Sequence, residues 1–184
     1  MQGLNNGDFW SAIGCHSCDI NFQNYIFSMK NIISHTLIPY KGNIPFFLKN
    51  IFKKHKISTN IINTLMIIAL SAFFDPNKKN PEKLRLPFNI YTGEIIKKRW
   101  EKWKDYDPIY NIEKHSSLKS LKSIKSIFID CGSKDQYNLQ FGARKLNNKL
   151  KAYHIPHYFE EFNDNHSSLD YRLDKSLIYL SRYM

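Results

Sequence analysis

The last third of the sequence contains segments in the order strand, helix, strand, helix, and this order constrains the fold more than any other feature. Residues 124–131 and 158–162 are short apolar runs typical of buried strands, and Gly132 closes the first. Between them, apolar residues recur at spacings of four and three, the stripe of an amphipathic helix, and three leucines mark a closing helix. A strand, a crossover helix and a second strand predict an α/β fold with a parallel sheet. The apolar stripe of the crossover helix consists of Leu139, Ala143, Leu146, Leu150 and Tyr153, and the closing helix is marked by Leu173, Leu177 and Leu180.

The first two thirds add one strand and a long helical stretch. Residues 9–18 form an apolar run that ends in small and polar residues, which predicts another strand. Residues 21–118 follow a helical pattern, clearest over residues 61–72, with short helices expected near 95–104 and 115–121. Because 184 residues suit one domain, we expect residues 1–184 to form a single partial α/β domain with residues 21–118 as a helical excursion within it.

Polar residues follow each predicted strand, where a parallel sheet binds its ligands. They are residues 15–19, 132–135 and 163–166. A histidine that acts as a base needs a carboxylate to fix its tautomer and stabilise its charged form. Asp135 and His166 follow successive strands, so they are the candidate catalytic pair. The spacing alone leaves a second interpretation open, in which Asp135 caps the next helix and His166 is an ordinary loop residue.

Three segments carry a family resemblance: residues 9–17, residues 86–108, and residues 127–172. The third is the most specific, with Ile-Asp-Cys-Gly-Ser-Lys-Asp ending at Asp135 and Glu-Glu-Phe-Asn-Asp-Asn-His ending at His166. Together they resemble the esterase family of α/β-hydrolases that contains esterase D-like and enterochelin-esterase-like enzymes. The resemblance implies that Asp135 is the acid and His166 the base of a catalytic triad that hydrolyses carboxylic esters or thioesters without a cofactor.

The chain departs from this family at the nucleophile. Family members carry a G-x-S-x-G turn that exposes the attacking serine, and this sequence contains none. The family places that turn shortly before the segment that matches residues 1–9, so the resemblance implies a truncated, C-terminal half of an esterase. We expect such a chain to be inactive alone, to take an ester substrate only when an N-terminal half completes it, and to self-associate through an exposed strand edge. Ser17 lacks the flanking glycines, and Ser167 and Ser168 adjoin the histidine too closely in sequence for its ring nitrogen to activate their hydroxyls.

The cysteines and the chain's hydropathy suggest a compartment. Three cysteines are an odd number, which argues against a fully paired secreted protein. The start of the sequence shows no leader pattern, and the longest apolar stretch, residues 65–74, is too short to span a bilayer. These features predict a cytoplasmic location and no membrane partner. Cys15-x-x-Cys18 is compatible with a redox or zinc site, but buried free thiols at a strand end are the favoured interpretation, with no metal or cofactor.

The net charge leaves a second class of function open. Lys and Arg number 27 against 16 Asp and Glu, a formal charge of +11. Lysines interleaved with Phe46, Phe47, Phe52, Trp100 and Trp103 could contact nucleic acid through phosphates and stacking. The alternative function is therefore a non-catalytic basic module that binds nucleic acid or a protein partner. A solvated lysine surface is favoured over it, because no nucleic-acid motif is present, and the two tryptophans are expected in the core.

Overall fold

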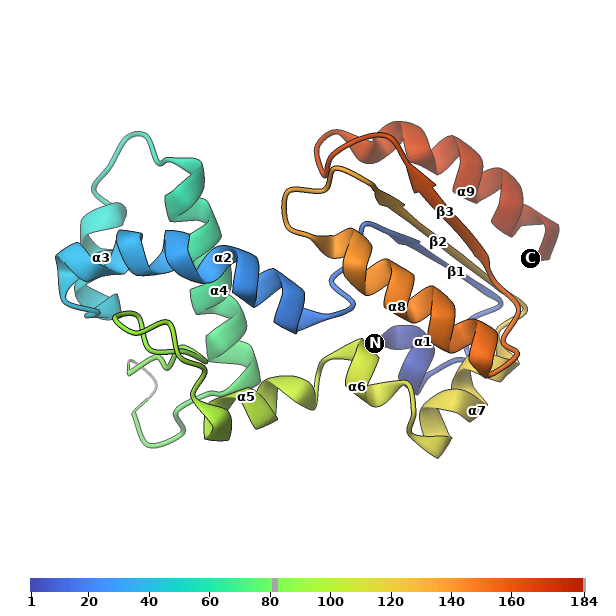
Figure 1. The fold of residues 1–184 in the computed structure, drawn as a ribbon, viewed down its shortest axis with the longest axis horizontal. Coiled ribbons are helices and arrows are strands. Elements are labelled where there is room, and N and C mark those ends of the chain that lie inside the picture. The colour runs from blue at the N-terminus through green and yellow to red at the C-terminus, as the bar shows by residue number, and fades with distance from the viewer. Residues whose placement is uncertain (81–82, 184) are drawn as a thin grey trace. The chain divides into compact units, whose positions relative to one another are not determined.

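The computed structural model describes residues 1–80 and 83–183, and the chain divides into two compact units. One unit combines Met1–Tyr25 with Asp107–Met184, and the other is Ile26–Tyr106. The first holds all three strands, and the second is built mainly of helices (Figure 1). The residues of the predicted catalytic pair both belong to the first unit.

The sheet of the first unit consists of β1 (Ala12–His16), β2 (Ser126–Gly132) and β3 (Tyr158–Phe162). They lie in the order β1-β2-β3 and both pairs are parallel, as the arrows in Figure 1 show. All seven residues of β2 are buried, as expected for a central strand covered on both faces. The predicted parallel sheet with a helical crossover is therefore confirmed.

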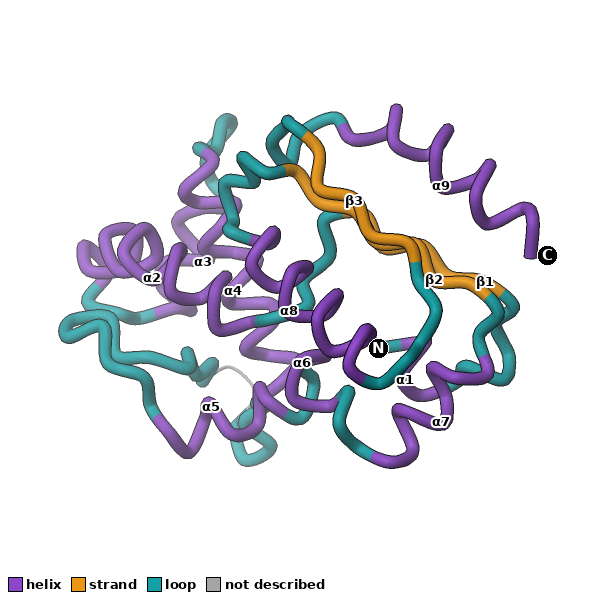
Figure 2. The backbone as a smooth tube through the Cα atoms, turned by 45° about the vertical axis from the view of Figure 1, so that its right-hand side comes forward, coloured by secondary structure: helices purple, strands orange, loops and turns teal. Residues whose placement is uncertain are grey.

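Helices cover both faces of this sheet. The crossover α8 (Leu139–Ala152) lies on one face and α9 (Leu173–Leu180) on the other (Figures 1 and 2). The short helices α1 (Gln2–Asn5), α6 (Pro108–Asn111) and α7 (His115–Ser123) complete the unit. The apolar stripe predicted for α8 does face the core, since its main members are buried: Leu139, Ala143 and Leu150.

The closing helix differs from its prediction in which side it buries. Leu173 and Leu177 are 45% and 57% exposed, although the leucine spacing marked them as the packed face. Arg172, just before α9, and Ser176 within it are instead 3% and 2% exposed. The sheet offers polar partners to these two side chains, and hydrogen bonds to them decide which face of α9 turns inward.

The second unit contains most of α2 (Phe22–Leu37), and all of α3 (Ile44–Ile51), α4 (Thr59–Phe74) and α5 (Lys97–Lys104). Trp100 and Trp103 are 8% and 0% exposed, so they are core residues as expected. Asp75, at the end of α4, is buried and pairs with Arg85 at 2.5 Å and Lys102 at 2.6 Å. Across the described ranges of both units, helices fall short of the length and apolarity that crossing a bilayer requires.

Candidate active site

Asp135 and His166 meet at the carboxyl end of the sheet. The Nδ1 atom of His166 lies 2.9 Å from Oδ2 of Asp135, and the aspartate side chain is fully buried. The other carboxylate oxygen, Oδ1, accepts a hydrogen bond of 2.9 Å from the backbone N–H of Tyr137, in the turn that leads into α8. One carboxylate oxygen therefore holds the turn before α8, and the other contacts the histidine.

The loop that carries His166 is fixed by contacts with the end of β2. The backbone N–H of His166 donates to Oε1 of Gln136 at 3.0 Å, and the N–H of Lys134 donates to the carbonyl of Asp164 at 2.9 Å. A Cβ atom on Gly132 would lie 2.4 Å from that same carbonyl oxygen. Only glycine therefore lets the two loops approach closely enough for the hydrogen bond between Asp135 and His166.

The electrostatics favour a charged histidine. The hydrogen bond to Asp135 raises the pKa of His166, and this outweighs the opposing effect of partial burial. A donor is needed opposite the carboxylate, so Nδ1 carries a proton and Nε2 of the neutral ring is left with its lone pair. Tyr137 contacts the ring edge-on, with centroids 5.0 Å apart, and limits its rotation. The arrangement suits a histidine that takes up and releases a proton at Nε2.

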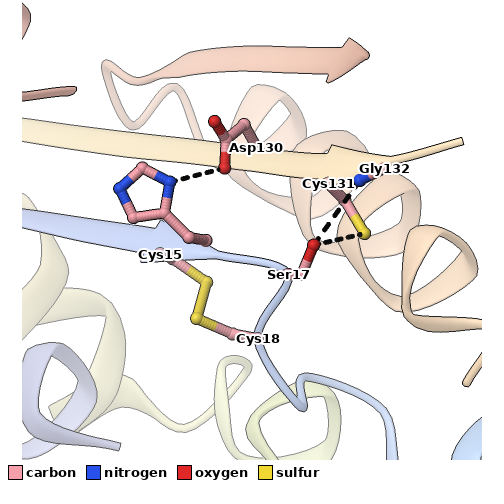
Figure 3. The surroundings of a disulfide bond; sticks show 7 residues. Cys15, Ser17, Cys18, Asp130, Cys131 and Gly132 are labelled. Atoms are coloured by element: carbon pink, nitrogen blue, oxygen red, sulfur yellow. Dashed lines mark hydrogen bonds and ion pairs between the residues drawn. A yellow bond between two sulfur atoms is a disulfide. The ribbon is translucent and has the colours of Figure 1, made fainter. Parts of the chain in front are cut away.

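None of the hydroxyl groups in the described part of the chain forms a hydrogen bond with Nε2 of His166. Ser17 is 4% exposed, and its hydroxyl donates to Sγ of Cys131 at 3.5 Å and accepts from the N–H of Gly132 at 3.5 Å (Figure 3). Its backbone φ of 42° is left-handed, and the hydroxyl is directed between the strands. Ser17 therefore stabilises the ends of β1 and β2 and is not poised for attack.

The cysteines correct one expectation. Cys15 and Cys18 are half-buried and joined by a disulfide bond (Figure 3), although the sequence favoured free, buried thiols. The tight turn through Ser17 brings their Cα atoms to 5.7 Å, a separation that a disulfide can bridge. Cys131 is free and buried, and desolvation raises its pKa to about 11, which keeps it a thiol.

A second chain of serine, histidine and aspartate lies under α9, and sequence reasoning missed it. Nδ1 of His16 is 2.8 Å from Oδ1 of Asp130, and Nε2 of His16 is 2.9 Å from the hydroxyl of Ser176. Oδ2 of Asp130 also pairs with Nε of Arg172 at 2.8 Å. This order of contacts is that of a catalytic triad, but Ser176 is 2% exposed and cannot meet a substrate. The network connects α9 to the sheet.

An apolar cavity of about 530 Å³ lies within the first unit, beside β1 and α8. Asp19, in the loop after β1, contributes a carboxyl group to its wall. Asp19 is accessible to solvent, yet the protein around it desolvates the carboxyl and raises its pKa to about 6; the charge of His166 opposes this rise and that of Asp135 adds to it. The apolar wall of the cavity includes Ile13, Ile20, Ile127, Ile129, Leu146 and Leu150.

Comparisons with known proteins give little further information. No protein-family model matches the sequence. No curated protein matches it either. Among solved structures, a ferulic acid esterase is similar with a TM-score of 0.39 and 16% sequence identity, over 53% of this chain and 36% of that one. The chain thus matches little more than a third of that esterase, and a likeness at this level assigns no activity.

Proposed function

We propose that Asp135 and His166 are the acid and the base of a serine-type hydrolase of carboxylic esters or thioesters. The observation that carries the proposal is the 2.9 Å contact between Nδ1 of His166 and a buried carboxylate at the ligand-binding edge of a parallel sheet. The motifs around both residues, which resemble esterase D-like and enterochelin-esterase-like enzymes, support the same assignment.

In this proposal the chemistry follows from the orientation of the histidine. Nε2 of His166 removes the proton of an attacking serine hydroxyl and then donates it to the leaving oxygen or sulfur. Asp135 keeps the ring in the required tautomer and stabilises the imidazolium formed in each step. The same stabilisation of the charged ring by Asp135 raises the pKa of His166 before any substrate reacts. No cofactor takes part.

The proposal assigns the attacking serine to a segment outside this sequence. Within the described residues, β1 is the outer strand of its sheet, so its second edge is open to pairing. A parallel strand added there would end at the same edge as Asp135 and His166, and it would need a helical crossover that covers one face of the sheet. The apolar cavity beside β1 and α8 offers apolar surface for such a helix. Without that segment, we expect no hydrolysis.

The test compares this chain with a longer one. The DNA that precedes the codon for Met1 is sequenced in all frames, and any segment encoding G-x-S-x-G is joined to the chain or co-expressed with it. With p-nitrophenyl acetate, the extended protein should show a burst of p-nitrophenol that His166→Ala abolishes. Asp135→Asn should lower its turnover by about 10⁴-fold. Asp174→Asn, an exposed aspartate on α9, is the matched control and should leave the rate unchanged.

Two results would contradict the proposal. Burst hydrolysis by the isolated chain that Ser17→Ala abolishes would locate the nucleophile within this sequence. Activity of the extended protein that survives His166→Ala would remove the histidine from the reaction.

A further inference from the structure

The positive charge of this protein is concentrated in one of its two units. The helical unit, Ile26–Tyr106, contains fifteen Lys and Arg against five Asp and Glu, a net charge of 15 − 5 = +10. The unit with the candidate active site contains twelve against eleven, a net charge of +1. Residues 20–74 include six lysines and no acidic residue. Attraction to anions is therefore a property of the helical unit and is separate from the proposed hydrolysis.

Within that unit, one segment combines the charge with exposed apolar side chains. We call residues 46–57, from α3 to the loop before α4, the basic–aromatic segment (Figure 1). Helix α3 buries one face through Ile44, Phe47 and Ile51. Phe46 and Phe52 point away from that core and are 54% and 82% exposed. The remaining exposed members are Lys49, Lys53, Lys54, His55, Lys56 and Ile57.

The lysines of the segment stand apart from the ion pairs that the described residues form. None of Lys49, Lys53, Lys54 and Lys56 forms an ion pair with a carboxylate among the residues that the structure describes. A single exposed apolar residue is ordinary on a protein surface. Two phenylalanines and an isoleucine within twelve residues, alternating with four unpaired cations, form a surface that is both apolar and strongly basic.

We propose that the basic–aromatic segment binds the surface of an anionic phospholipid bilayer. Phe46, Phe52 and Ile57 would enter the boundary between headgroups and acyl chains, and the lysines would contact lipid phosphates while their stems cover the apolar residues. The segment lies on the membrane and does not span it. This arrangement suits both kinds of side chain, because the bilayer removes the phenylalanines from water and places negative charge beside the lysines.

The structure favours a bilayer over nucleic acid as the partner. Single-stranded nucleic acid is held by exposed aromatic rings on which bases stack. Of the five rings that the sequence offered for stacking, only Phe46 and Phe52 are exposed; Phe47, Trp100 and Trp103 are 0%, 8% and 0% exposed. Ile57 has no ring on which a base could stack. The exposed apolar side chains are thus better suited to hydrocarbon than to bases.

The experiment measures co-sedimentation of the full chain with phosphatidylcholine vesicles that contain or lack phosphatidylserine. Binding should require phosphatidylserine and weaken with salt. Lys53→Glu with Lys54→Glu should lower the partition coefficient by at least about 25-fold, at roughly fivefold for each lysine lost, because the added glutamates also repel anionic lipid. Phe52→Ser should lower it by at least about tenfold through lost apolar burial. Circular dichroism of each variant confirms that it is folded.

The matched control is Lys78→Glu with Lys79→Glu, an exposed lysine pair of the same unit outside the segment. It changes the net charge equally and should lower vesicle binding much less. The proposal would be overturned if both double variants lost vesicle binding equally, or if Phe52→Ser left binding unchanged. Either result would show that binding depends only on net charge. Failure to bind anionic vesicles, with tight binding of a single-stranded oligonucleotide that depends on Phe52, would assign the segment to nucleic acid instead.

Discussion

Asp135 performs two tasks with one side chain, and they can be separated by substitution. Asp135→Asn keeps an oxygen that can accept from the backbone N–H of Tyr137 but removes the negative charge beside His166. We expect the pKa of His166 to fall toward its ordinary value, because the hydrogen bond to Asp135 is the largest cause that raises it. Histidine resonances followed by NMR across a pH titration measure this. An unchanged pKa, or an equal fall in Asp174→Asn, would show that the pair does not interact in solution.

The same pair makes stability depend on pH. The folded-state pKa of His166 is raised, so the charged pair stabilises the fold below the unfolded pKa of about 6.5, and this contribution is lost as pH rises through the folded pKa. Urea unfolding at a series of pH values should therefore show wild type losing more stability than Asp135→Asn over this range. A parallel pH dependence for the two proteins would contradict the linkage.

The absence of a side chain at Gly132 lets the loop that carries His166 lie close to the end of β2. In Gly132→Ala the new Cβ would lie 2.4 Å from the carbonyl oxygen of Asp164, so the loop that carries His166 has to move. We expect a loss of about 1–3 kcal/mol in the free energy of unfolding and a fall in the pKa of His166. Gly14→Ala is the matched control in the neighbouring strand, where the added Cβ would meet a leucine side chain at 3.4 Å, an ordinary contact. Equal effects of the two substitutions would argue against the role of close approach.

Helix α9 is attached to the sheet by polar side chains, so removing these side chains should lower the free energy of unfolding. Asp130→Ala leaves a buried arginine and a half-buried histidine without their shared partner, so we expect a loss of about 3–5 kcal/mol in the free energy of unfolding. Ser176→Ala removes one hydroxyl, with its hydrogen bonds to His16 and to the carbonyl of Leu173, and should lose about 1 kcal/mol. Asp174→Ala, on the exposed side of the same helix, should be neutral. Urea denaturation gives all three values, and a neutral Asp130→Ala would show that α9 is held by other contacts.

The chain as a whole leaves apolar and unpaired surface uncovered. In the described residues, β1 has one unpaired edge, and α9 exposes Leu173 and Leu177. An open strand edge next to apolar surface favours association between copies. We therefore expect the isolated chain to self-associate at micromolar concentrations. Size-exclusion chromatography with light scattering tests this, and a cooperatively unfolding monomer of 21.8 kDa would contradict it.

The elements and the candidate pair could be predicted because they depend on short-range patterns. A strand or helix shows its period within a dozen residues, which is why residues 158–162 agree with β3 at both ends and the stripe of α8 is buried. Parallel strands end at a common edge, so the contact between Asp135 and His166 could be expected from two strands and one crossover.

The remaining features were decided by tertiary structure. His16 lies 114 residues from Asp130 and 160 from Ser176, and no local pattern records which side chains meet at such separations. The leucine spacing of α9 identifies an apolar face, but the polar partners offered by the sheet decide which face turns inward. The disulfide between Cys15 and Cys18 depends on the tight turn through Ser17, which the spacing of the cysteines does not specify. The sequence by itself thus determined the order of elements and the pair at their edge, because both follow from local periodicity and chain direction. Long-range contacts required the folded chain, because the free energy of each depends on groups that only folding brings together.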